Sequence, residues 1–288
     1  MLFRSALYDR FVNQGAVMGD SFGLENVLWF ANNKEDAHEE PTIKRSRSHD
    51  YVSKEVINVR ENVGLIEVAN FSKHEFKGPD ARKFLDHIMA GRLPKPGRIS
   101  LSPMLSYRGK LCGDLTVTCL DENEFMVFGS GAAQEMHRRW FESHLDKFNL
   151  NYKNRSDEFH GLSIAGPNSR KVLEKIVRDD VSNEKFKFRD SRRMFVGGVP
   201  AIINRISFTG ELGYEIYVAP HYQLKLYEEL MEAGKEFNIK PFGGRALMSM
   251  RLEKNWGAWT LDYRPDFTAK ETGLDAFINW DKEFIGKE

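Results

Sequence analysis

An eleven-residue segment that occurs twice constrains the fold of this chain more than any other feature. Residues 78–88 (GPDARKFLDHI) recur as residues 166–176 (GPNSRKVLEKI), and each copy follows a β-like segment, at 73–77 and 161–165. Each copy has Asp or Asn where the N-cap of a helix belongs. Strand, Gly-Pro and helix in succession is also a common local arrangement. We favour a duplicated strand–turn–helix half over that alternative.

The duplication predicts a pseudo-symmetric α+β core whose two halves meet at a cleft, a usual place for a ligand. We place the halves at about 51–155 and 156–288, so that one domain covers 51–288. The preceding lead-in segment, residues 1–50, mixes a short helical piece at 6–14 with Gly-rich stretches. It ends in a polar surface loop at 32–50.

Hydrophobic periodicity locates the other elements. Alternation predicts strands at 65–69, 99–104, 111–120 and 124–128, and a hairpin of 193–196 with 199–208 around Gly197-Gly198. Helical spacing predicts helices at 51–62, 132–148, 222–237 and 245–252.

Residues 206–218 (ISFTGELGYEIYV) predict two buried strands joined by a tight turn that carries one acid, Glu211. The two glycines of the turn would supply unusual backbone angles. A carboxylate fixed there could bind the hydrogen-bond donors along one edge of a ligand. The alternative is an ordinary acid in a surface hairpin.

Two more charged residues stand in unusual surroundings. Asp114 lies within an apolar strand, where Asp is depleted. It is either a carboxylate held in a cleft to orient or deprotonate a ligand amine, or an edge-strand acid that faces water or pairs with an arginine. Arg245 follows two glycines at a helix start, and it is either a fixed planar donor or a solvated arginine.

Overall composition favours neither nucleic acid nor a membrane as a partner, although local charged patches stay open. Lys+Arg and Asp+Glu are 42 each, so no global field favours nucleic acid or a membrane surface, and no apolar run reaches a membrane span of roughly 18–20 residues. Cys112 and Cys119, seven apart in one β-segment, predict neither a disulfide nor a zinc site, which favours a cytoplasmic location. His137 and His144 are predicted to be surface histidines, too far apart in sequence for one metal, so we expect no metal site.

Four ordered segments carry a family resemblance: the strand of Asp114, residues 164–167 (IAGP), 207–215 (SFTGELGYE) and 245–254 (RALMSMRLEK). Together they resemble the folate-binding aminomethyltransferase domain of the glycine cleavage T-protein family. Residues 15–19 (GAVMG), 29–31 (WFA), 91–94 (GRLP) and 269–275 (AKETGLD) are similar to the C-terminal half of dimethylglycine and sarcosine dehydrogenase-type proteins. The resemblance covers nearly the whole chain.

The resemblance implies the T-protein folate-binding fold, with antiparallel sheets. Relatives of this kind continue into a C-terminal β-barrel, which we expect to be absent here, as in a truncated chain. The dehydrogenases also carry an N-terminal flavin domain. We therefore expect FAD only through a separate or missing domain.

The resemblance also implies roles for five residues. Glu211 would accept the N–H and amino donors of a pterin edge, and Arg245 would support the same end of the folate. Asp114 would orient the reactive folate nitrogen or take its proton. Leu101 would pack against the ring, and Tyr214 would form part of the pocket wall.

The implied function is tetrahydrofolate-dependent transfer of a one-carbon unit from an N-methyl amine, within a dimethylglycine or sarcosine demethylating oxidoreductase. The possible partners are a flavin domain or a lipoyl carrier protein. Two alternatives stay open: a freestanding glycine cleavage aminomethyltransferase, and a folate-binding scaffold without turnover.

Overall fold

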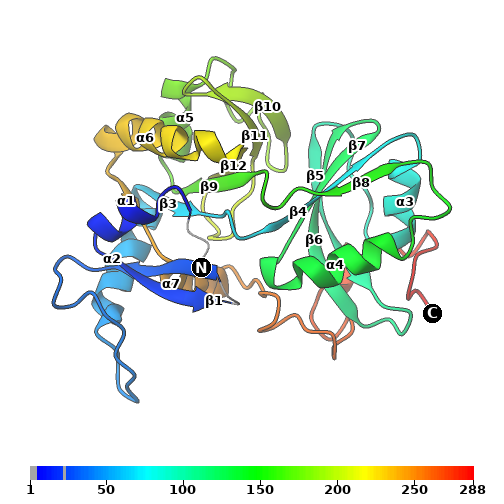
Figure 1. Cartoon of the computed structure of the whole chain (residues 1–288), viewed down its shortest axis with the longest axis horizontal. Helices are drawn as coiled ribbons and strands as arrows, with labels where there is room; N and C mark the ends of the chain where they lie inside the picture. The colour runs from blue at the N-terminus through cyan, green and yellow to red at the C-terminus, as the bar shows by residue number, and fades with distance from the viewer. Residues whose placement is uncertain (1–4, 22–23) are drawn as a thin grey trace. The chain divides into compact units, whose positions relative to one another are not determined.

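The computed structural model describes residues 5–21 and 24–288 of the chain (Figure 1). The chain forms two compact units, each built from separate segments. The first unit comprises Met1–Ala69, Phe159–Phe188 and Arg193–Trp256, and the second comprises Asn70–Glu158, Arg189–Arg192 and Gly257–Glu288. Each unit combines helices with a largely antiparallel sheet, so the predicted α+β class is confirmed.

The second unit contains a five-stranded sheet in the order β5-β6-β7-β4-β8. Its strands are β4 (Ser72–Lys77), β5 (Arg98–Leu105), β6 (Leu111–Asp121), β7 (Glu124–Gly129) and β8 (Asn151–Asn154). Its helical pieces are α3 (Ala81–Ile88), η1 (Gly131–Ala133), α4 (Gln134–Glu142) and η4 (Asp275–Phe277). Phe76, Phe84, Val117 and Phe141 are fully buried in the core where α3 and α4 pack on this sheet. The predicted helix at 132–148 ends early, at Glu142, and Leu145 and Phe148 pack against the core from beyond its end.

The first unit contains a six-stranded sheet in the order β10-β11-β12-β9-β3-β13. Its strands are β3 (Val63–Glu67), β9 (His160–Ala165), β10 (Ser191–Val196), β11 (Val199–Asn204), β12 (Gly213–Val218) and β13 (Ile239–Pro241). Its helical pieces include α5 (Ser169–Ile176), η2 (Pro220–Tyr222), α6 (Gln223–Gly234) and η3 (Lys235–Phe237). Leu65, Ile164, Ile216 and Leu226 are fully buried in its core.

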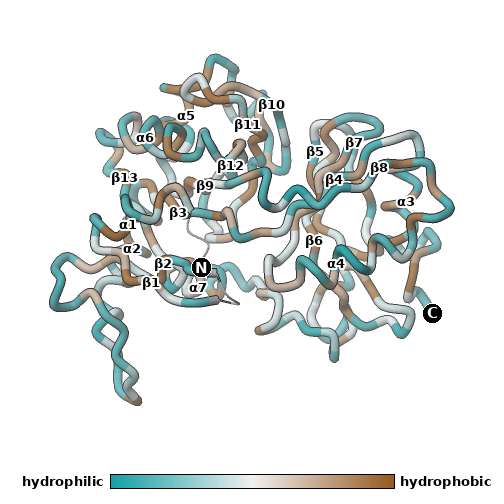
Figure 2. Tube along the Cα trace, in the orientation of Figure 1, coloured by the Kyte–Doolittle hydropathy of each residue, from teal (hydrophilic) through white to brown (hydrophobic). Residues whose placement is uncertain are grey.

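The lead-in segment belongs to the first unit and is more ordered than the sequence predicts. It contains α1 (Tyr8–Asn13) and an antiparallel hairpin of β1 (Ala16–Ser21) and β2 (Leu24–Phe30). The helix α2 (Ser48–Glu61) follows and packs beside α7 (Gly244–Glu253). Between β2 and α2 the chain forms a loop, which Figure 2 shows as mostly hydrophilic, so the expected polar loop is confirmed up to Arg47.

The two units share one topology, which confirms the pseudo-symmetric core. In each unit a strand is followed by a short helix and then by three strands that return beside it: β5-β6-β7-β4 in one unit and β10-β11-β12-β9 in the other. The strands that precede these repeats are exchanged. β3 comes directly before β4 but pairs with β9, whereas β8 comes directly before β9 but pairs with β4. This exchange explains why each unit is built from interleaved segments.

The two Gly-Pro turns have matching geometry. Gly78 has φ +143° and Gly166 has φ +131°, values that residues with a Cβ rarely adopt. Asp80 and Asn168 occupy the predicted N-cap positions of α3 and α5, although neither side chain caps its helix. The Asp80 carboxylate instead accepts a hydrogen bond from the backbone N–H of Asn149, at 2.8 Å.

We expect Gly166→Ala to destabilise the protein by about 3 kcal/mol or more. A Cβ at this position would lie 2.4 Å from the carbonyl oxygen of Asn62 and 2.5 Å from that of Val59, both backbone atoms. Gly198→Ala is the matched control: Gly198 has φ +79°, but a Cβ there meets no atom within 4 Å. It should cost about 1–2 kcal/mol. Urea denaturation of the two variants checks this, and equal losses would contradict it.

Candidate functional site

Asp114 lies in β6 of the second unit, opposite Pro103 of β5; the pairing of β6 with β7 begins two residues later, at Thr116. It is half-buried, and burial raises the pKa of its carboxyl group to about 7. No arginine pairs with it among the residues that the structure describes. It is therefore neither a fully water-exposed acid nor half of an ion pair, and near neutral pH its carboxyl group can take up or release a proton.

Leu101 lies next to Asp114 on the same face of this sheet. In the register of β5 with β6, Leu101 pairs with Thr116, and Pro103 pairs with Asp114. Paired residues share a face, and so do residues two apart in one strand. The structure therefore brings Leu101 and Asp114 together as diagonal neighbours, an apolar side chain beside a proton-exchanging carboxyl group.

The segment around Glu211, in the first unit, differs from its prediction. β11 ends at Asn204, so residues 206–208 are not a strand, and a bent loop connects β11 to β12. Gly210 has φ +89°, as the turn requires, but Gly213 has no positive φ. Gly213 is needed for space, because a Cβ there would lie 2.6 Å from the Ser207 side chain.

Both ends of this loop are anchored within the first unit. At its start, the Lys254 ammonium donates a hydrogen bond to the carbonyl oxygen of Ser207, at 2.7 Å. At its end, the carbonyl oxygen of Leu212 accepts hydrogen bonds from the Gly166 N–H, at 2.8 Å, and from the Ser169 hydroxyl, at 3.0 Å. The second Gly-Pro turn therefore holds the loop that carries Glu211.

The Glu211 carboxylate takes no part in these anchoring contacts. The residue is half-buried, and its backbone N–H donates to the Thr209 hydroxyl, at 3.2 Å. Its side chain has no hydrogen bond or ion pair within the described residues. Glu211 thus offers a carboxylate with open acceptor positions on a fixed backbone.

Tyr214 is buried inside the first unit, deeper than a side chain that lines an open pocket would be. It is fully buried in β12 within the core of the first unit, and its ring stacks on Phe186 with centroids 5.9 Å apart. Burial raises the pKa of its hydroxyl. Its role as pocket wall stays a prediction.

Arg245 lies at the start of α7 as predicted, one residue after Gly244, but it is not a free solvated arginine. One terminal nitrogen, Nη1, donates to the Ser48 hydroxyl at 2.6 Å, and the other, Nη2, pairs with Glu39 Oε2 at 2.5 Å. Both partners come from the segment before the repeats. Within the first unit the structure therefore fixes the guanidinium orientation.

Sequence reasoning missed Glu55, a buried acid in α2. Its carboxylate accepts hydrogen bonds from the backbone N–H groups of Phe30, at 2.7 Å, and Gly243, at 2.9 Å. Burial raises its pKa to about 7. Glu55 thus ties β2 to the start of α7. Glu55 lies between Val52 and Val59 on the apolar stripe of the helix predicted at 51–62, and this position is the sequence signal of its burial.

The prediction of surface histidines is wrong for His137. Only 1% of it is exposed, and its Nε2 lies 2.9 Å from the carbonyl oxygen of Cys112. Burial lowers its pKa to about 4, and burial also lowers the pKa of the adjacent buried His74 to about 3. The two rings are 6.1 Å apart. Both are therefore neutral core residues at physiological pH.

The described residues, 5–21 and 24–288, contain neither a metal-binding cluster nor a membrane-spanning helix. No group of three or more His, Cys, Asp or Glu side chains there could hold a metal ion. No helix there has the length and apolar character needed to cross a membrane. Cys112 and Cys119 are both free thiols.

Solved structures of other proteins have the same fold as this chain. The glycine cleavage system aminomethyltransferase T from Bartonella henselae matches with a TM-score of 0.84 at 22% identity, covering 100% of this chain and 73% of that one. A chain of the heterotetrameric sarcosine oxidase from Corynebacterium sp. U-96 matches with a TM-score of 0.51 at 18% identity, covering 68% of this chain and 97% of that one. At these identities the likeness concerns the fold alone, and it confirms the predicted T-protein fold.

Sequence comparison identifies relatives of two kinds. Mitochondrial dimethylglycine dehydrogenase from Homo sapiens is 35% identical over 289 residues, 99% of this chain and 33% of the relative. An aminomethyltransferase from Thermoanaerobacter pseudethanolicus is 30% identical over 234 residues, 80% of this chain and 63% of the relative. The chain spans about a third of the length of the dimethylglycine dehydrogenases it matches. The model of the GCVT N-terminal domain matches residues 7–282, so this chain belongs to the GCVT family of aminomethyltransferase-like domains.

Proposed function

We propose that this chain is a tetrahydrofolate-dependent one-carbon transfer domain that works with an N-methylglycine-type demethylating dehydrogenase. The observation that carries the proposal is Asp114, a half-buried carboxyl group with no ion-pair partner among the described residues and a pKa near 7, on β6 beside Leu101. A proton acceptor with a pKa close to the working pH suits general base catalysis. The family and the dehydrogenase relatives support the choice of reaction.

The folate-binding residues fit the chemistry of a pterin. The open carboxylate of Glu211 suits two adjacent N–H donors, because hydrogen bonds to an ionised acceptor are about twice as strong as neutral ones. The anchored loop would present that carboxylate without further ordering. The Arg245 guanidinium keeps N–H groups beyond those that Glu39 and Ser48 occupy. Leu101 offers an apolar contact beside Asp114.

Asp114 would accept the protons that the folate nitrogens release when the one-carbon unit is transferred to them. Tetrahydrofolate, when bound, supplies the amine nitrogens that receive the one-carbon unit. Asp114 would take the proton of the nitrogen that bonds to the iminium carbon and pass it to the departing amine. Both N–H protons that the folate gives up would end on that amine, which would depart as an ammonium ion. Holding nitrogen and carbon together supplies much of the rate.

A freestanding aminomethyltransferase is the second candidate. The Thermoanaerobacter aminomethyltransferase favours it, since it matches 80% of this chain at 30% identity. The same residues would then act on a carrier-bound aminomethyl group, whose carbon would move to the folate while ammonia and the carrier thiol depart, each taking one folate N–H proton. The higher identity of the human dehydrogenase, 35% against 30%, favours the first candidate.

One set of assays with the wild-type chain separates these functions. Tetrahydrofolate binding is titrated by calorimetry. Methylene-tetrahydrofolate is then measured with two donors: a flavoenzyme that is oxidising dimethylglycine, and an aminomethylated lipoyl carrier protein. We expect the chain to bind tetrahydrofolate. With the first donor, we expect methylene-tetrahydrofolate to form and the yield of free formaldehyde to fall.

Each other outcome supports a different conclusion. Turnover with the carrier protein alone would favour the freestanding aminomethyltransferase. Binding without turnover from either donor would leave a folate-binding scaffold. No binding of tetrahydrofolate would overturn all three assignments. The compartment stays a prediction, and the two free cysteines favour the cytoplasm.

A further inference from the structure

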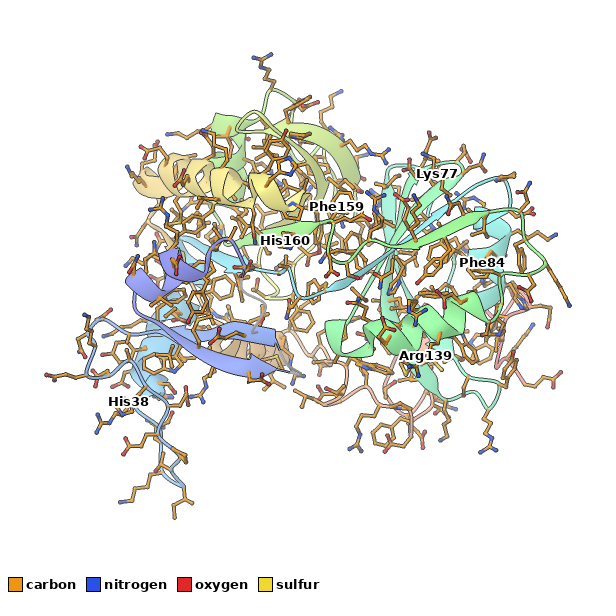
Figure 3. The ribbon with its side chains drawn as sticks, in the orientation of Figure 1. His38, Lys77, Phe84, Arg139, Phe159 and His160 are labelled. Carbon is orange, nitrogen blue, oxygen red and sulfur yellow. The ribbon has the colours of Figure 1, made fainter. Side chains whose placement is uncertain are left out.

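Arg245, a proposed folate-binding residue, is held by side chains that lie outside the duplicated core. Glu39 comes from the loop between β2 and α2, and Ser48 is the first residue of α2. His38, the neighbour of Glu39 in sequence, is labelled in Figure 3 on that loop. The segment before the repeats thus provides both side-chain contacts of the guanidinium among the described residues.

The Glu39 carboxylate is itself held in place. Its Oε1 accepts a hydrogen bond from the indole N–H of Trp29, at 2.6 Å, which leaves Oε2 for Arg245. Trp29 is fully buried and packs on Tyr51, with ring centroids 5.0 Å apart. The Tyr51 hydroxyl donates in turn to Asp36, at 2.6 Å. A buried tryptophan therefore fixes one oxygen of the carboxylate, and the other oxygen orients the guanidinium.

The backbone that carries Arg245 is anchored by the same segment. Glu55 accepts hydrogen bonds from the N–H groups of Gly243, just before α7, and of Phe30, at the end of β2. A Cβ at Gly243 would lie 2.2 Å from the carbonyl oxygen of Leu28, so the backbone before α7 touches the backbone of β2 there. The main chain and the side chain of Arg245 are thus both positioned from the lead-in segment.

We propose that Glu39 is a positioning residue for the one-carbon transfer site, orienting Arg245 for tetrahydrofolate. The inference rests on the proposed function. A long arginine side chain has many rotamers, and fixing two of its nitrogens before binding removes most of the ordering cost that a ligand would otherwise meet. The Nε–H and the second hydrogen on each terminal nitrogen remain available to an acceptor on the ligand.

Glu39→Gln tests the proposal. The amide retains an oxygen for the Trp29 indole but loses the charge that holds the guanidinium. We expect the KM for tetrahydrofolate to rise 5- to 20-fold, with kcat within twofold of the wild type. Glu40→Gln is the matched control, since Glu40 is an adjacent exposed acid that pairs with Arg47, at 3.0 Å. It should leave both constants unchanged.

Two further measurements distinguish positioning from a general effect on folding. In a double-mutant cycle, Glu39→Gln should raise the KM for tetrahydrofolate less than twofold when Arg245→Lys is already present. Modification of Arg245 by phenylglyoxal, followed by peptide mass spectrometry without folate, should be faster in Glu39→Gln than in the wild type. Wild-type affinity in Glu39→Gln, or fully additive effects, would overturn the role of Glu39 while the proposed function stands. No folate binding by the wild type would overturn both.

Discussion

Asp114→Asn is expected to lower the rate of methylene-tetrahydrofolate formation by about 10²–10⁴-fold, the usual contribution of a general base. The amide has the shape of the carboxyl group but cannot accept the proton of the reacting nitrogen. Asp121→Asn is the control: this exposed residue ends the same strand, and its change should leave the rate within twofold. A normal rate in Asp114→Asn would contradict the role of Asp114.

The pH dependence gives a second readout of the same residue. Burial raises the pKa of Asp114 from 3.8 to about 7, and the ionised form is the proton acceptor. Activity of the wild type should therefore rise with pH, reach half its maximum near pH 7, and fall about tenfold per pH unit well below it. The residual activity of Asp114→Asn should lack this inflection.

The same substitution should stabilise the fold at alkaline pH. Because the folded-state pKa is raised, the protonated carboxyl group favours the folded state. This stability is fully present below about pH 4 and is lost as pH rises through about 7. The neutral amide avoids that loss. We expect Asp114→Asn to raise the free energy of unfolding at pH 8 by on the order of 2–4 kcal/mol more than it does at pH 4. Denaturant titrations at the two pH values measure the difference, and a gain in stability with a loss of activity is typical of a functional residue.

Glu211→Gln is expected to weaken tetrahydrofolate binding by about 10- to 100-fold, because a charge-assisted pair of hydrogen bonds contributes about 1.5–3 kcal/mol. Glu211→Asp should lose less, since it keeps the charge on a shorter side chain. Calorimetric titration with tetrahydrofolate measures both variants.

Stability separates this effect from damage to the loop. The Glu211 contact within the loop is made by its backbone N–H, so Glu211→Gln should change the free energy of unfolding by less than about 0.5 kcal/mol. Glu232→Gln, in an exposed acid that pairs with Lys235, is the binding control. Unchanged affinity in Glu211→Gln would refute its proposed contact with the pterin.

Local sequence signals predicted several elements of this protein well. The helix that follows each Gly-Pro turn begins where the Asp or Asn position indicates. The strand that carries Asp114 runs from Leu111 to Asp121, against a predicted 111–120. Such features depend on residues close together in the chain, which is why sequence alone can place them.

The errors arose where distant contacts override local preference. Residues 206–208 have strand-like composition, but the anchoring of Ser207 by Lys254 and of Leu212 by the Gly166 turn bends them into a loop. The sequence around His137 predicts a surface position, yet His137 faces the sheet of the second unit. Each outcome depends on an element far away in sequence.

By itself, then, the sequence determined the duplicated strand–turn–helix halves, the α+β class and the acids and arginine proposed to act on folate. Only the tertiary structure decided that β3 and β8 exchange sheets, because strand pairing depends on which edges meet and not on the order of strands along the chain. Only the tertiary structure likewise decided which contacts hold Arg245. Glu39 and Arg245 are 206 residues apart, and no periodicity or local motif links residues at that separation.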